Sequence, residues 1–360
     1  MYSTHFNSRL QSQLATFPPL LESVDLHLSD DPFLLDDTEE DDWSTASVQR
    51  LVLAALRPCH SLTELSITMR PHSRLHLEPL QELTSLKTLT IDIAHACTED
   101  FDWCTFHEEQ IRAVAKLSSL RRLTLRECEY AEDMDEDDPM GTRWLRWFCP
   151  LPHQLQQLQE IDLSCHYLHL DHMQLLQRLP ALTAIEPACM YESSIPMLQA
   201  FAERLQCLSL SFTLFNDEEE IDPEMVDLDT GFARGSWLVP HLAPCATLTQ
   251  LTLSRCAFTE ADATTLCQAL LQLRELDLRD VGWPSFESLR HLPLLESFSL
   301  LRAKAYPLHF DAAHFKPLQR LRDLTLIGIH PLTEAAVALI DALRPPSGLL
   351  HALVDFCFSP

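Results

Sequence analysis

The amino-acid sequence predicts an α/β fold made of stacked strand–helix units. Leucines at 248, 251 and 253, followed by Cys256, form the frame LxxLxLxxC, and its leucine positions recur along the chain. Apolar and polar residues alternate through each frame, which is typical of a short strand with one buried face. Helical patterns separate successive frames. Because one such strand cannot bury its own leucines, neighbouring units must stack on each other.

The frames are spread over the whole chain. They begin at residues 21, 62, 86, 120, 158, 182, 205, 248, 273, 295 and 321, with a degenerate frame at 350, which gives about 11–12 repeats. In the sixth frame Pro187 replaces a leucine. Since proline lacks the N–H that a sheet ladder needs, we expect a short or bent strand there. Residues 1–20 form an N-terminal flank, and residues 345–360 form a degenerate C-terminal cap.

Three segments between frames have the apolar spacing of a helix. They are 108–117, 334–343 and the segment that follows Thr259. Thr259 has the chemistry of an N-cap residue, and Asp262 stands three residues later, where a capping box has its acidic or amide side chain. We therefore expect a helix in each of these segments.

On these leucine positions, and on Cys128 and Cys256 at the ninth position, the sequence resembles the leucine-rich repeat family, in its ribonuclease-inhibitor-like and F-box-associated forms. The resemblance implies a right-handed solenoid, a horseshoe with a concave parallel β-sheet and convex helices. It implies a single domain over residues 1–360 that recognises a protein partner on its concave face. No F-box is evident in the sequence.

The composition argues against several classes of partner and compartment. With 26 Lys and Arg against 53 Asp and Glu, the formal net charge is −27, which argues against direct binding of nucleic acid or anionic membranes and leaves basic proteins open. We find no basic region followed by an apolar run at the N-terminus and no apolar stretch of roughly 18 residues, so we expect neither a secretory signal nor a membrane span. The 12 cysteines form no tight framework, which predicts reduced thiols in a cytoplasmic or nuclear protein. Cys128, Cys207 and Cys256 occupy repeat positions, where we expect them to be small buried apolar residues.

Most of the negative charge lies in insertions between frames. The insertions are 29–42, 97–109, 127–147 and 215–237. The runs 29–42, 127–138 and 216–229 each hold eight acids and neither Lys nor Arg. Each of these three runs begins just after the last leucine of its frame, so in a repeat solenoid they would share one rim.

Two interpretations of these insertions stay open. Charged insertions are commonly solvated loops, and the tryptophans that follow them would then be packing anchors at the start of the helices. Alternatively, the acids and the tryptophans inside or just after the insertions form a rim that captures a basic segment of a partner, because aromatic side chains in a charged surround suit that role. These tryptophans are Trp43, Trp103, Trp144, Trp147 and Trp237.

The sequence gives little support for catalysis or metal binding. Only six glycines occur, and neither GxGxxG nor GxxxxGK[ST] is present. Asp133, Asp135 and Asp137 resemble the start of a calcium loop that lacks its glycine and its final glutamate. The trio of Cys97, Cys104 and His107 lacks the tight ligand pairs of a zinc site, and Cys149 has only His153 as a nominal base. We therefore predict no catalytic residue, no cofactor and no metal.

The candidate site residues point outward from the frame strands or lie in the insertions. They are Asp162, Arg126, Thr252, Asp277 and Arg279 on the strands, and Trp43, Trp144 and Trp147 in the insertions. We predict a non-catalytic protein-interaction scaffold, which the resemblance extends to substrate recognition for a ubiquitin ligase. The alternatives are an acidic-rim binder of basic proteins such as histones, and a cysteine-dependent enzyme.

Overall fold

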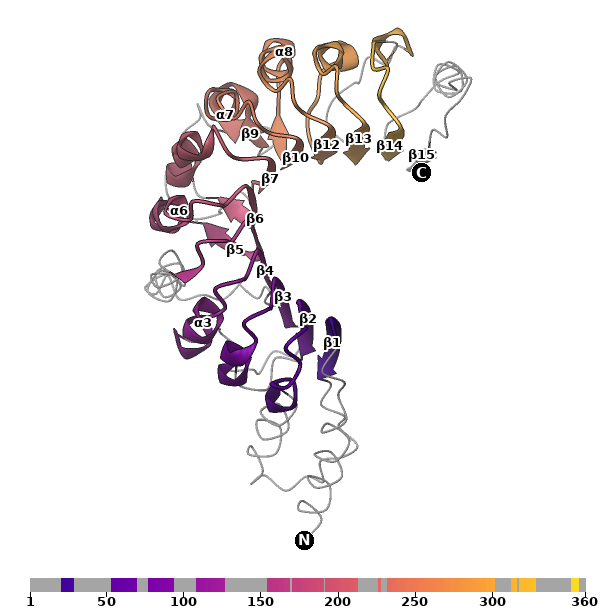
Figure 1. The fold of residues 1–360 in the computed structure, drawn as a ribbon. Helices are drawn as coiled ribbons and strands as arrows, with labels where there is room; N and C mark the ends of the chain where they lie inside the picture. Colours follow the sequence, from indigo (N-terminus) through magenta and orange to yellow (C-terminus); the bar gives the residue numbers. More distant parts are fainter. Residues whose placement is uncertain are drawn as a thin grey trace, which may run out of the picture. The chain divides into compact units, whose positions relative to one another are not determined.

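The computed structural model describes residues 21–28, 53–69, 77–93, 108–126, 154–168, 170–190, 192–212, 226–227, 232–301, 312–315, 317–327 and 351–355. The chain divides into two compact units, Met1–Leu182 and Thr183–Pro360. Within each unit, parallel strands follow one another in sequence order along a sheet, and helices connect them (Figure 1). This is the α/β leucine-rich repeat solenoid that the sequence predicts. That the whole chain is one domain stays a prediction.

The first unit contains a parallel sheet in the order β1-β2-β3-β4-β5. The strands are β1 (Ser23–Leu28), β2 (Glu64–Met69), β3 (Thr88–Ile93), β4 (Arg122–Arg126) and β5 (Glu160–Leu168). Their register aligns the frames, with Leu65 opposite Leu89 and Leu89 opposite Leu123. The connecting elements η1 (Glu78–Glu82), α3 (Glu108–Ala115) and α6 (Leu170–Gln177) lie on one face of this sheet (Figure 1).

The second unit repeats this design. Its strands are β6 (Ala184–Met190), β7 (Cys207–Ser211), β10 (Gln250–Ser254), β12 (Glu275–Arg279), β13 (Ser297–Leu301), β14 (Asp323–Ile327) and β15 (His351–Asp355). Its helices are η2 (Glu192–Phe201), α7 (Gly235–Leu242), α8 (Glu260–Ala269), η3 (Phe286–His291) and η4 (Ala312–Phe315). They again lie on one face of the sheet (Figure 1).

The frame residues form the core of both units, as the alternation predicts. The apolar frame residues from Leu62 to Leu326 are all at most 8% exposed. Full burial of one leucine side chain stabilises a fold by about 1.5–3 kcal/mol, so repetition of the frame supplies much of the stability. Leu21 and Leu26 in the first frame are only half-buried.

Several of the connections between strands are 3₁₀ helices and not α-helices. The family resemblance implies helices in these positions but does not say of which type. The α-helix α8 lies in a repeat of 25 residues, between Leu248 and Leu273, whereas the 3₁₀ helix η3 lies in the next repeat of 22 residues. A 3₁₀ helix rises about 2.0 Å per residue, against 1.5 Å in an α-helix, so it spans the same distance with fewer residues. Pro196, within η2, also disfavours continued α-helical hydrogen bonding in that element.

Two of the three predicted helices are confirmed. Residues 108–117 contain α3, and α8 begins after Thr259. Thr259 and Asp262 form a capping box, in which the Asp262 backbone N–H donates to the threonine hydroxyl oxygen and the Thr259 backbone N–H donates to the carboxylate. The predicted helix at 334–343 lies outside the described residues.

The strand that contains Pro187 is not short. β6 runs for seven residues, and Pro187 is buried within it. Of the two alternatives that the proline predicts, a short strand is therefore wrong, and a bent strand stays a prediction. The register of β6 with β7 pairs Ala184 with Cys207 and Ile185 with Leu208, ahead of the proline, so these ladder positions do not need the N–H that proline lacks.

The end of the fourth insertion folds onto the second unit. β8 (Val226–Asp227) pairs antiparallel with β9 (Phe232–Arg234), and β9 pairs parallel with β11 (Cys256–Ala257), so a small second sheet follows the exit of β10. Arg255, between β10 and β11, has a φ of 55°. This left-handed residue turns the chain so that Cys256 enters the core, fully buried.

Burial lowers the pKa of His241 in α7. Its ring packs edge-on against Trp237 with centroids 6.1 Å apart, and its Nδ1 is buried without a hydrogen-bond partner among the described residues. A group whose folded pKa is depressed binds more protons when unfolded, so stability falls as the pH drops below about 6.5 towards the folded pKa. We expect His241→Phe to remove this part of the pH dependence. Urea unfolding at pH 7.5 and 5.5 measures it, and identical pH dependence in both proteins would contradict the assignment.

Candidate protein-binding face

In the first unit, outward side chains form rows across the strands on the face that lacks helices. The middle row runs Asp25, Ser66, Thr90, Thr124, Asp162, each opposite the next in the strand register. These five residues are the outward positions that the alternation predicts. Thr124 is 7% exposed and the other four are half-buried or exposed, so the row is open to solvent over most of its length.

The second unit has a matching row. It runs Ser209, Thr252, Asp277, Ser299 and Thr325, again in register. All five residues are half-buried. The predicted site residues Thr252 and Asp277 therefore lie side by side on neighbouring strands, with hydroxyl residues continuing the row on both sides.

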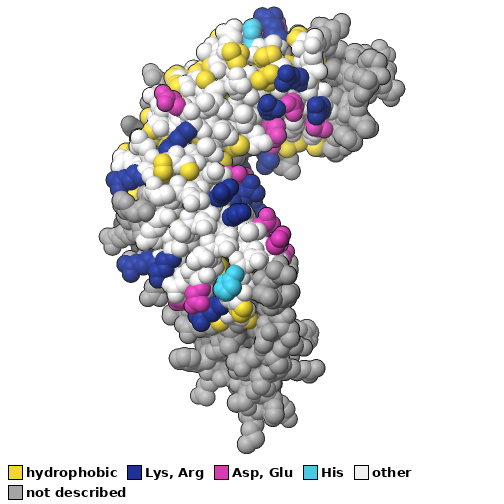
Figure 2. Space-filling model, in the orientation of Figure 1, with side chains coloured by type: hydrophobic (Ala, Val, Ile, Leu, Met, Phe, Trp, Pro, Cys, Tyr) yellow, Lys and Arg dark blue, Asp and Glu magenta, His cyan; other side chains and the backbone are white. Residues whose placement is uncertain are grey.

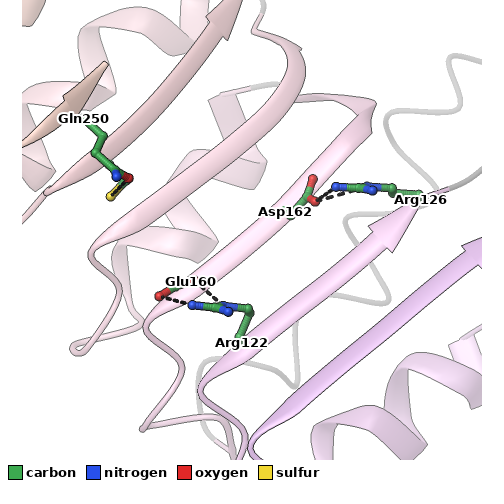
Figure 3. A network of polar contacts seen from close by, with 6 residues as sticks. Arg122, Arg126, Glu160, Asp162 and Gln250 are labelled. Carbon is green, nitrogen blue, oxygen red and sulfur yellow. Dashed lines mark hydrogen bonds and ion pairs between the residues drawn. The ribbon is translucent and has the colours of Figure 1, made fainter. Parts of the chain in front are cut away.

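Two arginine–carboxylate pairs join β4 to β5 on the face of the first unit (Figure 3). Arg126 Nη2 donates to Asp162 Oδ2 at 2.8 Å, and the Asp162 side chain is 13% exposed. The structure thus brings together two of the predicted site residues. Arg122 donates through Nε and Nη2 to the two carboxylate oxygens of Glu160. This hydrogen bonding raises the pKa of Arg122, against an opposing effect of burial.

The first outward position of each strand was missed as a candidate site. Arg122 and Glu160 belong to it, as do Glu64 in β2 and Gln250 in β10. The signal was available in the sequence. Each missed residue lies two positions before the outward residue that the alternation already identifies in its strand, so the same period of two predicts that it points outward as well. The prediction began one outward position too late along each strand.

Asp277 and Arg279 pair within one strand. Arg279 Nη2 lies 2.7 Å from Asp277 Oδ2, two residues away on the same face of β12. Asp277 Oδ1 is buried and has no hydrogen-bond partner among the described residues. The pair leaves the arginine side chain 58% exposed. On the face drawn in Figure 2, Lys and Arg side chains likewise lie beside Asp and Glu side chains in several places.

The predicted tryptophan sites cannot be compared with the structure. Trp43, Trp144 and Trp147 lie outside the described residues, as does most of each acidic run. Trp237 lies at the end of the fourth insertion, in α7. Its ring packs against that of Phe212, which follows β7, with ring centroids 6.3 Å apart. Its position at the start of a helix matches the packing-anchor interpretation for this one tryptophan.

Among the described residues we find no group of three or more His, Cys, Asp or Glu side chains that could hold a metal ion. The candidate ligands Cys97, Cys104 and His107, and the aspartates 133, 135 and 137, lie outside these residues. No helix in the described part of the chain is both long and apolar enough to cross a membrane.

The described cysteines differ in burial between the core and the face of the sheet that lacks helices, which we call the open face. Burial raises the pKa of Cys59, Cys256 and Cys245, the last to about 11, and desolvation raises that of Cys267 to about 12. Cys207 was expected to be a buried residue, which is wrong, because it occupies an outward position of β7 and is half-buried.

We expect iodoacetamide to label Cys207 fastest among these five cysteines in the native protein, since the thiolate is the reactive form. All cysteines should label after denaturation without reductant. Site-resolved mass spectrometry measures both results. Equal native labelling of Cys207 and Cys256 would contradict the assignment of faces.

No protein-family model and no curated protein matches the chain. Solved structures with similar folds include a leucine-rich repeat protein of Leptospira interrogans, with a TM-score of 0.47 and 13% identity over 98% of this chain and 71% of that one. An internalin of Listeria monocytogenes has a TM-score of 0.38 and 17% identity over 68% of this chain and 56% of its own. A plant peptide hormone receptor, RGFR1 in complex with RGF2, has a TM-score of 0.38 and 13% identity over 84% of this chain and 45% of its own.

This chain therefore covers about half the length of the internalin and of the receptor. At this level of similarity, the fold assignment rests on the repeat frames and the strand register of the chain itself.

Proposed function

We propose that this leucine-rich repeat chain is a non-catalytic protein-interaction scaffold that binds its partner on the helix-free face of its sheets. The supporting observation is the pair of polar rows, which the strands hold in register and which are at least half-buried in most positions but reach solvent on the face opposite the frame residues. Asp162 and Arg126 would contribute in the first unit, and Thr252, Asp277 and Arg279 in the second. Short side chains on flat strands offer a partner both hydrogen-bond donors and acceptors with little entropy to lose.

Substitutions that add bulk and charge to this face test the proposal. Thr252→Arg places a long side chain in the middle of the second row, while Gln268→Arg makes the same charge change at an exposed position of α8 on the helical side. Affinity purification with quantitative mass spectrometry should show partners that bind the native protein and Gln268→Arg but are depleted with Thr252→Arg. Equal recovery of every partner by both variants would contradict binding on this face.

The finer prediction, substrate recognition for a ubiquitin ligase, rests on the sequence resemblance alone, and the prediction of a cytoplasmic or nuclear location rests on the pattern of cysteines. The same purification tests it. Ligase subunits should be recovered with the native protein and with Thr252→Arg, since a recognition module contacts the ligase away from its substrate. Recovery of substrates without any ligase subunit would remove this prediction and leave the scaffold function.

One observation favours the acidic-rim alternative for the fourth insertion. The run 216–225 is bounded by Phe212, whose backbone N–H donates to the Ser254 carbonyl, and by β8, which pairs with β9. The described residues on either side of the run, Phe212 and β8, thus lie near the exits of β7 and β10, the edge at which the sequence predicts a rim. Clustered acids there would attract a basic partner.

Replacement of 216–225 by a neutral Gly/Ser linker of equal length tests this alternative. Binding of a basic partner such as a histone should weaken and lose its dependence on salt, because exposed charges are screened over about 8 Å at physiological ionic strength. Unchanged binding would contradict the rim function and leave the open face as the better site.

A further inference from the structure

The outward side chains of β2 and β3 differ from those of the neighbouring strands. All six are acceptors of hydrogen bonds, and none is basic or apolar; they are Glu64, Ser66, Thr68, Thr88, Thr90 and Asp92. Glu64 is exposed and Asp92 is half-buried. Neither carboxylate makes an ion pair or a side-chain hydrogen bond with another described residue, but Glu64 lies close enough to Arg122 for its charge to help raise the pKa of that arginine. We call these six residues the β2–β3 patch.

The same sheet face shows which group such carboxylates bind. On β4 and β5, Arg122 and Arg126 extend across to Glu160 and Asp162 on the next strand (Figure 3). The carboxylates of β5 therefore accept hydrogen bonds from the guanidinium groups of the neighbouring strand. The patch has carboxylates in the same kind of position but no arginine of its own. Among the described outward residues of this unit, the two arginines, Arg122 and Arg126, are already engaged with carboxylates of β5, so neither forms an ion pair with Glu64 or Asp92.

The positions of the two carboxylates define a spacing. In the strand register Glu64 is opposite Thr88, and Asp92 is opposite Thr68, so the carboxylates lie at opposite ends of the patch on neighbouring strands. Four residues along a strand span about 13 Å, and adjacent strands lie about 4.8 Å apart, which places the two Cα atoms roughly 14 Å from each other. An extended peptide covers this distance in four residues, and its residues i and i+4 point to the same side.

We propose that the β2–β3 patch binds an extended partner segment that lies along the strands and carries two arginines four residues apart. One arginine pairs with Glu64 and the other with Asp92, and a small residue midway between them rests on the hydroxyl groups of Ser66 and Thr90. This inference rests on the proposed function of the open face and adds a class of partner to it.

Three synthetic peptides test the spacing. Each has two arginines, neutral capped ends and a Gly/Ser spacer of one, three or five residues. Because the three peptides have the same charge, the acidic runs attract them equally, and a difference in affinity comes from the register of the carboxylates. We expect the peptide with the three-residue spacer to bind on the order of fivefold more tightly than the other two, as a second well-placed exposed ion pair would give. The difference should shrink in 1 M salt, where screening is effective over about 3 Å.

Paired variants assign the difference to the patch. Glu64→Gln with Asp92→Asn should abolish the preference for the three-residue spacer. Glu275→Gln with Asp323→Asn makes the same change of charge at two exposed outward positions of the second unit and should preserve the preference. Urea unfolding of both variants checks that the exposed substitutions leave the fold intact.

Equal affinities for the three peptides, binding too weak to measure for all of them, or a preference that survives in the Glu64→Gln, Asp92→Asn variant would each overturn the inference. The effect of Thr252→Arg on natural partners is measured separately, so failure of the spacing rule is distinguishable from failure of open-face recognition.

Discussion

Replacement of Leu251 or Leu276 by alanine should lower the free energy of unfolding by about 2–5 kcal/mol. The two leucines are 1% and 2% exposed, and they lie opposite each other on β10 and β12. Each substitution removes the transfer free energy of the lost carbons and leaves a cavity, because the flanking repeats are held in register by the sheet and cannot close around it. Urea unfolding monitored by circular dichroism measures the loss.

Thr252→Ala is the matched control. Thr252 lies next to Leu251 on the same strand, but its side chain points to the open face and is half-buried. It should change the free energy of unfolding by no more than about 0.5 kcal/mol, as substitutions away from the core usually do. Similar losses for Leu251→Ala and Thr252→Ala would show that the division of this strand into a buried and an open side is wrong.

The sequence predicts the core of this fold well because its signal is local and repeated. Leu65, Leu89 and Leu123 are three residues from different frames, yet one short pattern identifies all of them, and stacking aligns them. The outward rows follow from the same alternation. The Arg126–Asp162 contact was not predictable as a pair, because Asp162 lies opposite Thr124 and the arginine reaches it diagonally.

Features that depend on contacts between distant segments were not predicted. The pairing of β9 with β11 joins the end of an acidic insertion to the two residues of β11, shortly after β10. These strands are three and two residues long, which is too short for an alternation of apolar and polar residues to be recognised in the sequence. The positive φ values of Arg255 and Asp280 were equally hidden, since arginine and aspartate give no glycine signal. These two residues occupy equivalent positions after β10 and β12, so the two neighbouring repeats share this turn.

Gly235→Ala should destabilise the protein by about 1–3 kcal/mol, although the same change within a helix ordinarily stabilises it. Gly235 is the first residue of α7 and follows β9 directly. A Cβ atom there would lie 2.5 Å from Phe258 Cδ1 and 3.0 Å from Phe258 Cα. Phe258 is 5% exposed, so its ring has little room to move, and its backbone is fixed by a hydrogen bond from its N–H to the Gly282 carbonyl. A loss of stability, and not a gain, would therefore show that Gly235 and Phe258 lie in close contact.

Two further variants isolate this contact. Ser236→Ala makes a helix-favouring change at the adjacent exposed residue and should be neutral or slightly stabilising. Phe258→Ala removes the ring atoms nearest to the new methyl group, so combining it with Gly235→Ala should cost less than the sum of the two single losses, as coupled neighbours do. Strictly additive losses in urea unfolding, or stabilisation by Gly235→Ala alone, would mean that the end of the fourth insertion is not packed against the segment that follows β10. In that case the acidic run would lose its fixed attachment, and the argument for a rim at this edge would fail with it.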